Sequence, residues 1–131
     1  MSGNIVQQAA AIGMAASACA VAVAASPGDA RRGAEIYTRC QACHALDYNR
    51  TGPKHCGVIG RKAASVAGFD YSPAMKRAKL SWHEKTLDRF LANPPKMVPG
   101  TTMTYAGVPD AQERADLIAY LRDAGKSPPC R

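Results

Sequence analysis

The segment Cys40-Gln-Ala-Cys-His44 constrains this chain more than any other, because it sets two thiols and an imidazole at a fixed short spacing. On a helix, residues three and four apart lie on one face, so all three side chains would point the same way. Two thiols placed there can bond to the vinyl groups of a haem while the imidazole coordinates its iron. The C-x-x-C-H spacing therefore predicts one covalent haem c, attached through Cys40 and Cys43, with His44 as an axial ligand.

A C-x-x-C pair by itself has two other common explanations, a thioredoxin-like redox motif and half of a zinc site. The redox motif needs a βαβ context, and no run of β-branched residues flanks Cys40. A zinc site needs a second pair of ligands, but His55 and Cys56 are adjacent rather than suitably spaced. Haem attachment is therefore the interpretation that we favour.

The first 28 residues carry no charged side chain, and residues 5–25 are apolar and rich in alanine. Small residues at 22–25 close this segment, a pattern typical of a secretory signal peptide and its cleavage site. We expect removal of residues 1–25, a domain spanning 26–131, a location in the bacterial periplasm, and no stable membrane insertion. Two alternatives stay open. About 20 residues can span a bilayer as an uncleaved anchor. The segment Ala16-Ser-Ala-Cys19 faintly resembles a lipoprotein cleavage site.

The net charge of +7 comes entirely from the chain after residue 28, where 17 Lys and Arg outnumber 10 Asp and Glu. A small domain with such an excess is steered toward acidic surfaces. Nucleic acid is the generic partner of a basic protein, but the sequence has no basic cluster interleaved with aromatic residues and no DNA-binding motif. We therefore expect a monomer that binds acidic proteins and not nucleic acid.

Helix starts can be read from residue types that cap helices. The capping candidates are Asp29, Ser72 before Pro73, the capping-box pattern Ser81-Trp-His-Glu84, and Asp110. We expect the first helix to run through the Cys-His motif and the last to end at Gly125. Residues 45–72 are rich in glycine and turn residues and are expected to form loop. No strand signal is present, so the fold class is all-α, with loops wrapped around the haem.

The second axial ligand of the iron decides what the haem does, because an open position permits ligand binding or catalysis and a filled one favours electron transfer. Spacing alone does not choose among the candidates. These are Met75, Met97, Met103, His55, His83 and several lysines.

A series of segments resembles the class I cytochromes c, of the mitochondrial and bacterial cytochrome c2 type. In chain order the segments are Cys40–His44, Thr51–Pro53, Gly57–Arg61, Gly68–Tyr71, Trp82, Asn93–Pro94, Val98–Met103, Tyr105–Gly107 and Arg114–Leu121. The resemblance implies the class I cytochrome c fold, with three main helices plus short helices and loops around one haem c. It also implies a soluble one-electron carrier that cycles Fe(III)/Fe(II), not an enzyme, in a respiratory or photosynthetic electron-transport chain.

The resemblance also assigns roles around the haem. It implies that Met103 is the distal iron ligand and that the Pro53 carbonyl accepts a hydrogen bond from His44. Thr101 matches a position that binds a buried water near the methionine ligand. Residues matching those that hydrogen-bond a buried haem propionate are Arg61, Tyr71 and Trp82.

Partner binding and a disulfide follow from the same resemblance. The partners implied are acidic redox proteins such as a bc1-type complex, a terminal oxidase or a reaction centre. The candidate docking residues are Arg39, Arg50, Lys54 and Lys96. In the family fold the loop near Cys56 lies close to the end of the C-terminal helix, so a Cys56–Cys130 disulfide is expected. His55 and His83 are expected on the surface.

Two alternatives to a soluble electron carrier stay open, and each requires a different feature of the protein. A peroxidase-like enzyme or gas-binding haem protein needs a labile sixth ligand on the iron. A membrane-tethered carrier needs residues 1–25 to persist.

Overall fold

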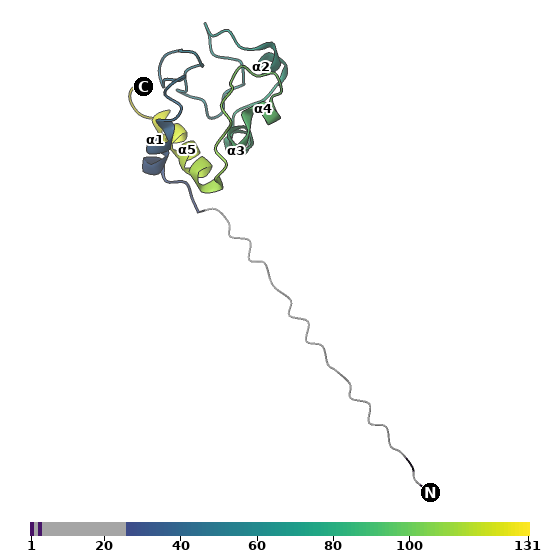
Figure 1. The fold of residues 1–131 in the computed structure, drawn as a ribbon. Coiled ribbons are helices and arrows are strands. Elements are labelled where there is room, and N and C mark those ends of the chain that lie inside the picture. Colours follow the sequence, from purple (N-terminus) through teal and green to yellow (C-terminus); the bar gives the residue numbers. More distant parts are fainter. Residues whose placement is uncertain (2, 4–25) are drawn as a thin grey trace.

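The computed structural model describes residues 1, 3 and 26–131, so nearly all of the expected signal peptide lies outside the described residues. The described part contains helices and loops without a strand, apart from one isolated antiparallel bridge between Lys62 and Ser81. The expected all-α fold is confirmed. The helices are α1 (Ala30–Tyr37), α2 (Pro73–Arg77), α3 (Glu84–Ala92), α4 (Pro94–Met97) and α5 (Ala111–Ala124) (Figure 1).

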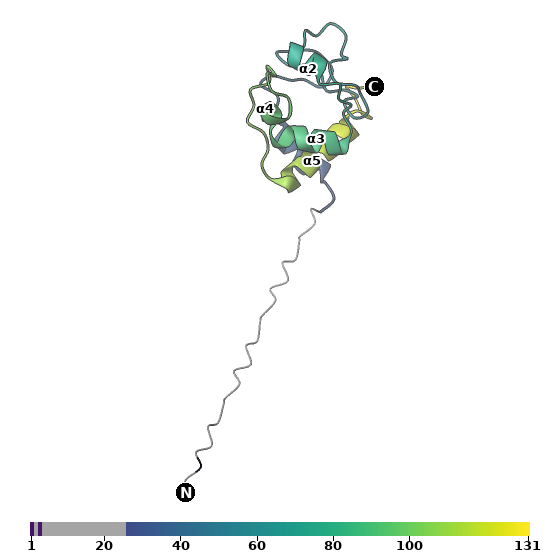
Figure 2. The ribbon, with the colours of Figure 1, turned by 90° about the vertical axis from the view of Figure 1, so that its right-hand side faces the viewer.

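Helices α1 and α5 pack side by side (Figure 1). Helix α2 lies across the molecule from α3 and α5 (Figures 1 and 2). Gly33 makes the close approach of α1 to α5 possible. A Cβ atom at Gly33 would lie 2.6 Å from the carbonyl carbon of Asp116 and 2.7 Å from the Cβ of Tyr120. The first and last helices therefore pack backbone to backbone, and residues far apart in the chain meet there.

Three of the expected helix caps are present. The Asp29 carboxylate accepts a hydrogen bond from the Arg31 N–H (2.8 Å), and the Asp110 carboxylate accepts one from the Glu113 N–H (2.8 Å). At α2 the Ser72 hydroxyl accepts from the backbone N–H at position 75 (3.1 Å). Each cap satisfies an N–H group that has no partner inside its helix.

Helix α1 is shorter than expected, because it ends at Tyr37 and does not run through the Cys-His motif. The Thr38 hydroxyl bonds to the Glu35 carbonyl (2.6 Å) and so competes with the helical ladder. The chain then tightens into hydrogen-bonded turns. The N–H groups of Cys43 and His44 both donate to the Cys40 carbonyl (3.1 and 2.9 Å). The motif thus sits on a compact turn.

The start of α3 also differs from the expected capping box. His83, not Ser81, is the N-cap, and its N–H donates to the Thr86 hydroxyl (3.0 Å). Ser81 is used in the bridge to Lys62, and its carbonyl accepts from the same hydroxyl (2.6 Å). The three-residue spacing that forms the box is therefore His83–Thr86.

Helix α4 follows α3 directly, although a sequence such as Asn93-Pro94-Pro95 is typical of a helix end. The Asn93 side chain ends α3 and also caps the next helix, since its Oδ1 accepts from the Lys96 N–H (3.0 Å). Proline at the first helical positions costs no hydrogen bond, because the N–H groups there have no helical partner.

The buried core joins the helices to the loops. Its members are Ile36, Tyr37, Val58, Trp82, Leu87, Phe90, Leu91, Val98, Val108, Leu117, Ile118 and Leu121. The loop from 45 to 72 is present as expected and supplies Val58 to this core. Among the described residues, no helix has the length and apolar character needed to cross a bilayer.

Candidate haem site

The two motif cysteines are free thiols on the turn that follows α1. Cys40 is partly buried and packs against the core, whereas Cys43 is exposed. Burial raises the pKa of the Cys40 thiol, although the nearby Arg39 works in the opposite direction. Neither thiol is taken up in a disulfide, so both remain available to a covalently bound group.

The His44 ring is buried and fixed at its edge. Its Nδ1 donates a hydrogen bond to the Pro53 carbonyl (2.7 Å), the contact that the family resemblance implied. Because a carbonyl can only accept, Nδ1 carries the proton and Nε2 keeps a free lone pair for a metal. Burial lowers the pKa of His44, and the Pro53 carbonyl offsets part of that effect. The side chain is therefore held as the neutral tautomer that an iron ligand requires.

Gly52 lies directly against this ring. A Cβ atom at Gly52 would lie 2.6 Å from both ring nitrogens of His44. The Gly52 N–H also donates to the Cys43 carbonyl (2.7 Å), which ties the Thr51–Pro53 loop to the motif. Only glycine leaves room for the imidazole at this position.

Arg61 and Trp82, two of the three propionate candidates, are joined through their backbones. The Trp82 N–H donates to the Arg61 carbonyl (2.8 Å), and the indole is buried. The third candidate, Tyr71, accepts a hydrogen bond on its hydroxyl from the Val66 N–H (3.2 Å), which leaves its own proton free to donate. Burial lowers the pKa of Arg61, and Tyr71 partly opposes this, as expected for groups in one region.

The Arg61 guanidinium supplies a test of whether a haem fits here. Its two terminal nitrogens donate to the carbonyls of Cys56 (2.9 Å) and Lys54 (3.0 Å). Its Nε is buried and has no hydrogen-bond partner among the described residues. An unpartnered buried donor is costly, and a carboxylate such as a haem propionate would satisfy it. The residues present therefore fit the group.

Met103 sits at the end of a loop organised by short-range contacts. The Thr101 hydroxyl accepts from the Met103 N–H (3.2 Å), so Thr101 shapes the loop as well as being the expected water site. Met103 is partly buried and packs against the core, but Met75 and Met97 do so too. Packing alone does not separate these methionines, and Met103 as the iron ligand stays a prediction.

His55 is not on the surface as expected. It is partly buried, and its ring stacks on His44 with centroids 4.1 Å apart and planes 20° from parallel. The Tyr37 hydroxyl lies 3.1 Å from His55 Nδ1. Burial lowers the pKa of His55 to about 3, and the neighbouring His44 ring and the Arg61 guanidinium act in the same direction. The residues around position 55 show no periodicity that signals this burial. His83, in contrast, is exposed as expected.

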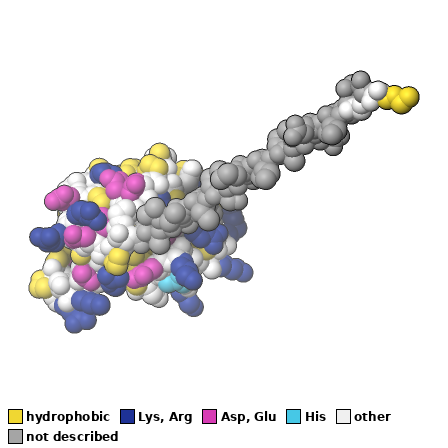
Figure 3. Space-filling model, turned by 90° about the horizontal axis from the view of Figure 1, so that it is seen from below, with side chains coloured by type: hydrophobic (Ala, Val, Ile, Leu, Met, Phe, Trp, Pro, Cys, Tyr) yellow, Lys and Arg dark blue, Asp and Glu magenta, His cyan; other side chains and the backbone are white. Residues whose placement is uncertain are grey.

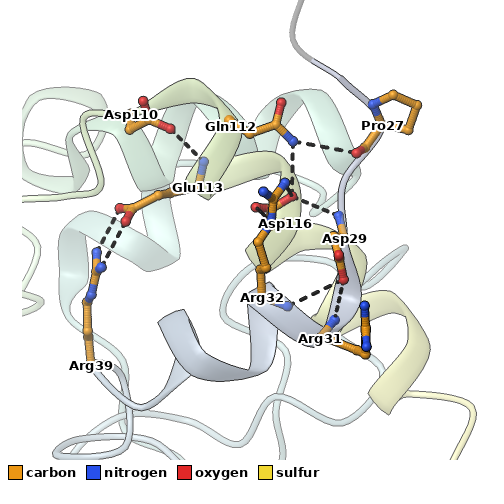
Figure 4. Close-up of polar contacts among 9 residues, drawn as sticks. All are labelled: Pro27, Asp29, Arg31, Arg32, Arg39, Asp110, Gln112, Glu113 and Asp116. Atoms are coloured by element: carbon orange, nitrogen blue, oxygen red, sulfur yellow. Dashed lines mark hydrogen bonds and ion pairs between the residues drawn. The ribbon is translucent and has the colours of Figure 1, made fainter.

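The docking candidates differ in how free their charges are. Arg39 forms a two-pronged ion pair with Glu113 (2.8 and 2.9 Å; Figure 4), so its charge is already partnered. The Arg50 guanidinium donates to the Gln41 carbonyl. Lys96 is exposed on α4, while Lys54 is only partly exposed. On the face seen in Figure 3, basic and acidic side chains are interspersed.

The structure joins Cys56 to Cys130, with Cα atoms 5.3 Å apart across 74 residues of sequence. The bridge ties the segment beside His55 to the end of the chain.

Comparison with known proteins gives matches over the same part of the chain. The family model described as Cytochrome c matches residues 30–125. Cytochrome c type-1 of Ascaris suum is 45% identical over 104 residues, which is 77% of this chain and 93% of that protein. Cytochrome c2 of Rhodomicrobium vannielii is 43% identical over 103 residues, 76% of this chain and 82% of that protein.

A solved structure agrees in fold. Cytochrome cH from Methylobacterium extorquens superposes with a TM-score of 0.72 at 40% identity, covering 73% of this chain and 99% of that one. Together with the fit of the buried residues to a haem, these matches identify the chain as a class I cytochrome c. It belongs to the cytochrome c family and is an electron-transfer protein, not an enzyme, that carries one electron at a time on a haem c attached through Cys40 and Cys43.

Proposed function

We propose that this protein carries electrons between complexes of a respiratory or photosynthetic chain in the bacterial periplasm, with His44 and Met103 as the two iron ligands. The observation that carries the proposal is the His44 ring, whose Nδ1 is committed to the Pro53 carbonyl while Nε2 stays free. A bacterial cytochrome c2 and a bacterial cytochrome cH are among the relatives, which supports the bacterial setting.

A bound haem c supplies an iron that takes up and releases one electron. His44 would offer such an iron a neutral, oriented imidazole, and its hydrogen bond to the Pro53 carbonyl increases its basicity. The Met103 thioether is a soft ligand that favours ferrous iron. With His44 and Met103 both holding the iron, small molecules would be kept off the metal and the bound group would supply one-electron transfer.

Arg61 is proposed to hold a haem propionate. Its guanidinium is already oriented by the carbonyls of Cys56 and Lys54, so the buried Nε is preorganised for a carboxylate. The hydroxyl of Tyr71 and the indole of Trp82 come from neighbouring segments and can add further donors. Pairing the propionate in this way avoids an unpaired buried charge.

The absorption spectrum of the purified haem protein tests the proposed ligands. We expect a low-spin ferric spectrum with the methionine–iron charge-transfer band and no reaction of the native protein with carbon monoxide. Met103→Ala should abolish the band and open the iron to carbon monoxide. Met75→Ala, a partly buried methionine in α2, is the matched control and should keep both properties. Carbon monoxide binding to the native protein would instead support the peroxidase-like or gas-binding alternative.

The redox partners are proposed to be acidic proteins, such as a bc1-type complex, a terminal oxidase or a reaction centre, because the chain carries a net charge of +7. Lys96 is the stronger docking candidate, since it is exposed, whereas Arg39 is paired with Glu113. Electron-transfer rates with such a partner should fall as salt rises, and Lys96→Glu should weaken that salt dependence. A rate that is unchanged at high salt would contradict electrostatic docking.

A further inference from the structure

We propose that His55 is a positioning residue that fixes the orientation of the His44 imidazole, and that Tyr37 holds His55 in place. The proposal rests on the proposed role of His44 as an iron ligand. It adds a residue that the family resemblance did not point to, and it starts from the stacked pair of imidazole rings.

The existing supports of His44 restrain the ring only in part. Pro53 holds its edge at Nδ1, Gly52 lies against its Cε1 side, and an iron bond at Nε2 would hold the other edge. A ring held at two edges can still tilt about the line that joins them. The His55 ring covers one face of His44, with centroids 4.1 Å apart and planes 20° from parallel, and therefore opposes that tilt.

His55 can act as a support because its own backbone is anchored. Its N–H donates to the carbonyls of Ala45 and Leu46, both at 3.0 Å. The next residue, Cys56, donates its N–H to the Leu46 carbonyl (2.7 Å) and is bridged to Cys130. The backbone at His55 is therefore held by hydrogen bonds before its Cα atom and by the anchored Cys56 after it, so the imidazole extends from a fixed position.

Tyr37 fixes the remaining freedom of the His55 ring. The phenol is 2% exposed, and its hydroxyl lies 3.1 Å from His55 Nδ1, within hydrogen-bond distance. The two rings also meet edge to face, with centroids 5.7 Å apart. Because Tyr37 belongs to α1 and packs on Tyr120 of α5, the support reaches back to the helix pair.

The plane of an axial imidazole decides which iron orbital it donates into, and hence how unpaired spin spreads over a ferric haem. Proton NMR of the ferric protein reads this directly as the spread of the haem methyl signals. His55→Leu removes the stacked ring, and we expect that pattern and the reduction potential both to shift. His55→Phe keeps a ring that can stack but loses the contact with the Tyr37 hydroxyl, so its pattern should shift clearly less than that of His55→Leu.

Two further variants separate positioning from general packing. Tyr37→Phe removes only the hydroxyl and should shift the pattern in the same direction as His55→Leu, by a smaller amount. In a His55→Phe background the Tyr37→Phe change should have no further effect, because the hydroxyl acts through His55. His83→Leu replaces an exposed histidine whose side chain is free of the site and is the matched control, with no shift expected.

The proposal is overturned if His55→Leu leaves the methyl pattern unchanged. It is also overturned if Tyr37→Phe shifts the pattern as much in the His55→Phe background as it does in the otherwise unmodified protein. If His55→Leu does not fold, the Tyr37→Phe and His55→Phe proteins decide between the same outcomes. A failure of the proposed function is distinguishable, because it appears in the unmodified protein as a spectrum without methionine–iron ligation, whatever the variants do.

Discussion

The His44 imidazole meets a different part of the chain at each of its sides. The Pro53 carbonyl accepts from its Nδ1, Gly52 lies against the ring, and His55 covers one face. The residues at 52 and 53 belong to a motif with a known place in the family, whereas the contact of His55 depends on how the loop folds back. The ligand is therefore restrained by more of the protein than the Cys-His motif alone suggests.

Gly52→Ala tests how tightly this ring is enclosed. The new Cβ would lie 2.6 Å from both ring nitrogens, so the imidazole or the loop must move. We expect a loss of about 1–3 kcal/mol of unfolding free energy from overpacking, with a weakened low-spin spectrum. Gly125→Ala is the control, because its Cβ would meet nothing closer than 3.5 Å. Denaturant unfolding and absorption spectroscopy give the two readings, and an unaltered spectrum in Gly52→Ala would refute the tight fit.

At the scale of the helices, the contact of α1 with α5 is organised by one buried carboxylate. Asp116 is 2% exposed and accepts from the Asp29 N–H (2.7 Å) and from Gln112 (3.0 Å), while Arg32 forms an ion pair with it (3.0 Å; Figure 4). The hydrogen bonds satisfy a charge that would be costly if unpaired. The N-terminal cap of α1 is thereby tied to the middle of α5.

Asp116→Asn should lower the unfolding free energy by about 1–3 kcal/mol, because the buried carboxylate and its charge-assisted bonds are lost. Burial by itself would raise the pKa of Asp116, but the Asp29 N–H, Gln112 and Arg32 hold it below the usual value. The carboxylate therefore contributes its full stability above the unfolded pKa of about 3.9 and loses it as pH falls through the lower folded pKa. Stability below about pH 4 should consequently vary less with pH in Asp116→Asn.

The control for this prediction is Glu84→Gln. Its ion pair with Arg122 lies on the surface, where both side chains are well exposed, so the loss should stay below about 1 kcal/mol. Thermal or denaturant unfolding across a pH series measures both proteins. Equal losses of unfolding free energy in the two variants would show that the buried Asp116 stabilises the fold no more than an exposed carboxylate does.

Some helix boundaries can be predicted from residue types alone. Asp29, Ser72 and Asp110 cap the helices that follow them, because capping depends on a side chain and an N–H only two or three residues away. The early end of α1 and the extra helix α4 depend on competing local bonds, those of Thr38 and Asn93. Such competition is hard to rank from residue types.

At the scale of the whole molecule, one disulfide joins two segments that lie far apart in the sequence. The Cys56–Cys130 bridge encloses most of the loops and helices, across 74 residues of sequence. A cross-link over a loop of this length restricts the unfolded chain far more than the folded one. Cys130 lies beyond the matched family region, which ends at residue 125.

Replacing both cysteines by serine should lower the unfolding free energy by about 4 kcal/mol on the loop-entropy estimate. The haem should remain attached, because Cys40 and Cys43 are untouched. Guanidinium unfolding of the two proteins measures the difference, and treating the unmodified protein with reductant should reproduce it. An unmodified protein with two titratable thiols beyond the haem cysteines would contradict the bridge.

The sequence by itself determined the haem attachment, the family and most helix starts, since these depend on residue types at spacings of a few positions. Only the tertiary structure decided that His55 stacks on His44, that Arg39 is neutralised by Glu113, and that Asp116 joins α1 to α5. The last two contacts join residues 74 and 87 positions apart. No local pattern encodes such pairs, because they form only when the loops and the two terminal helices close around one another.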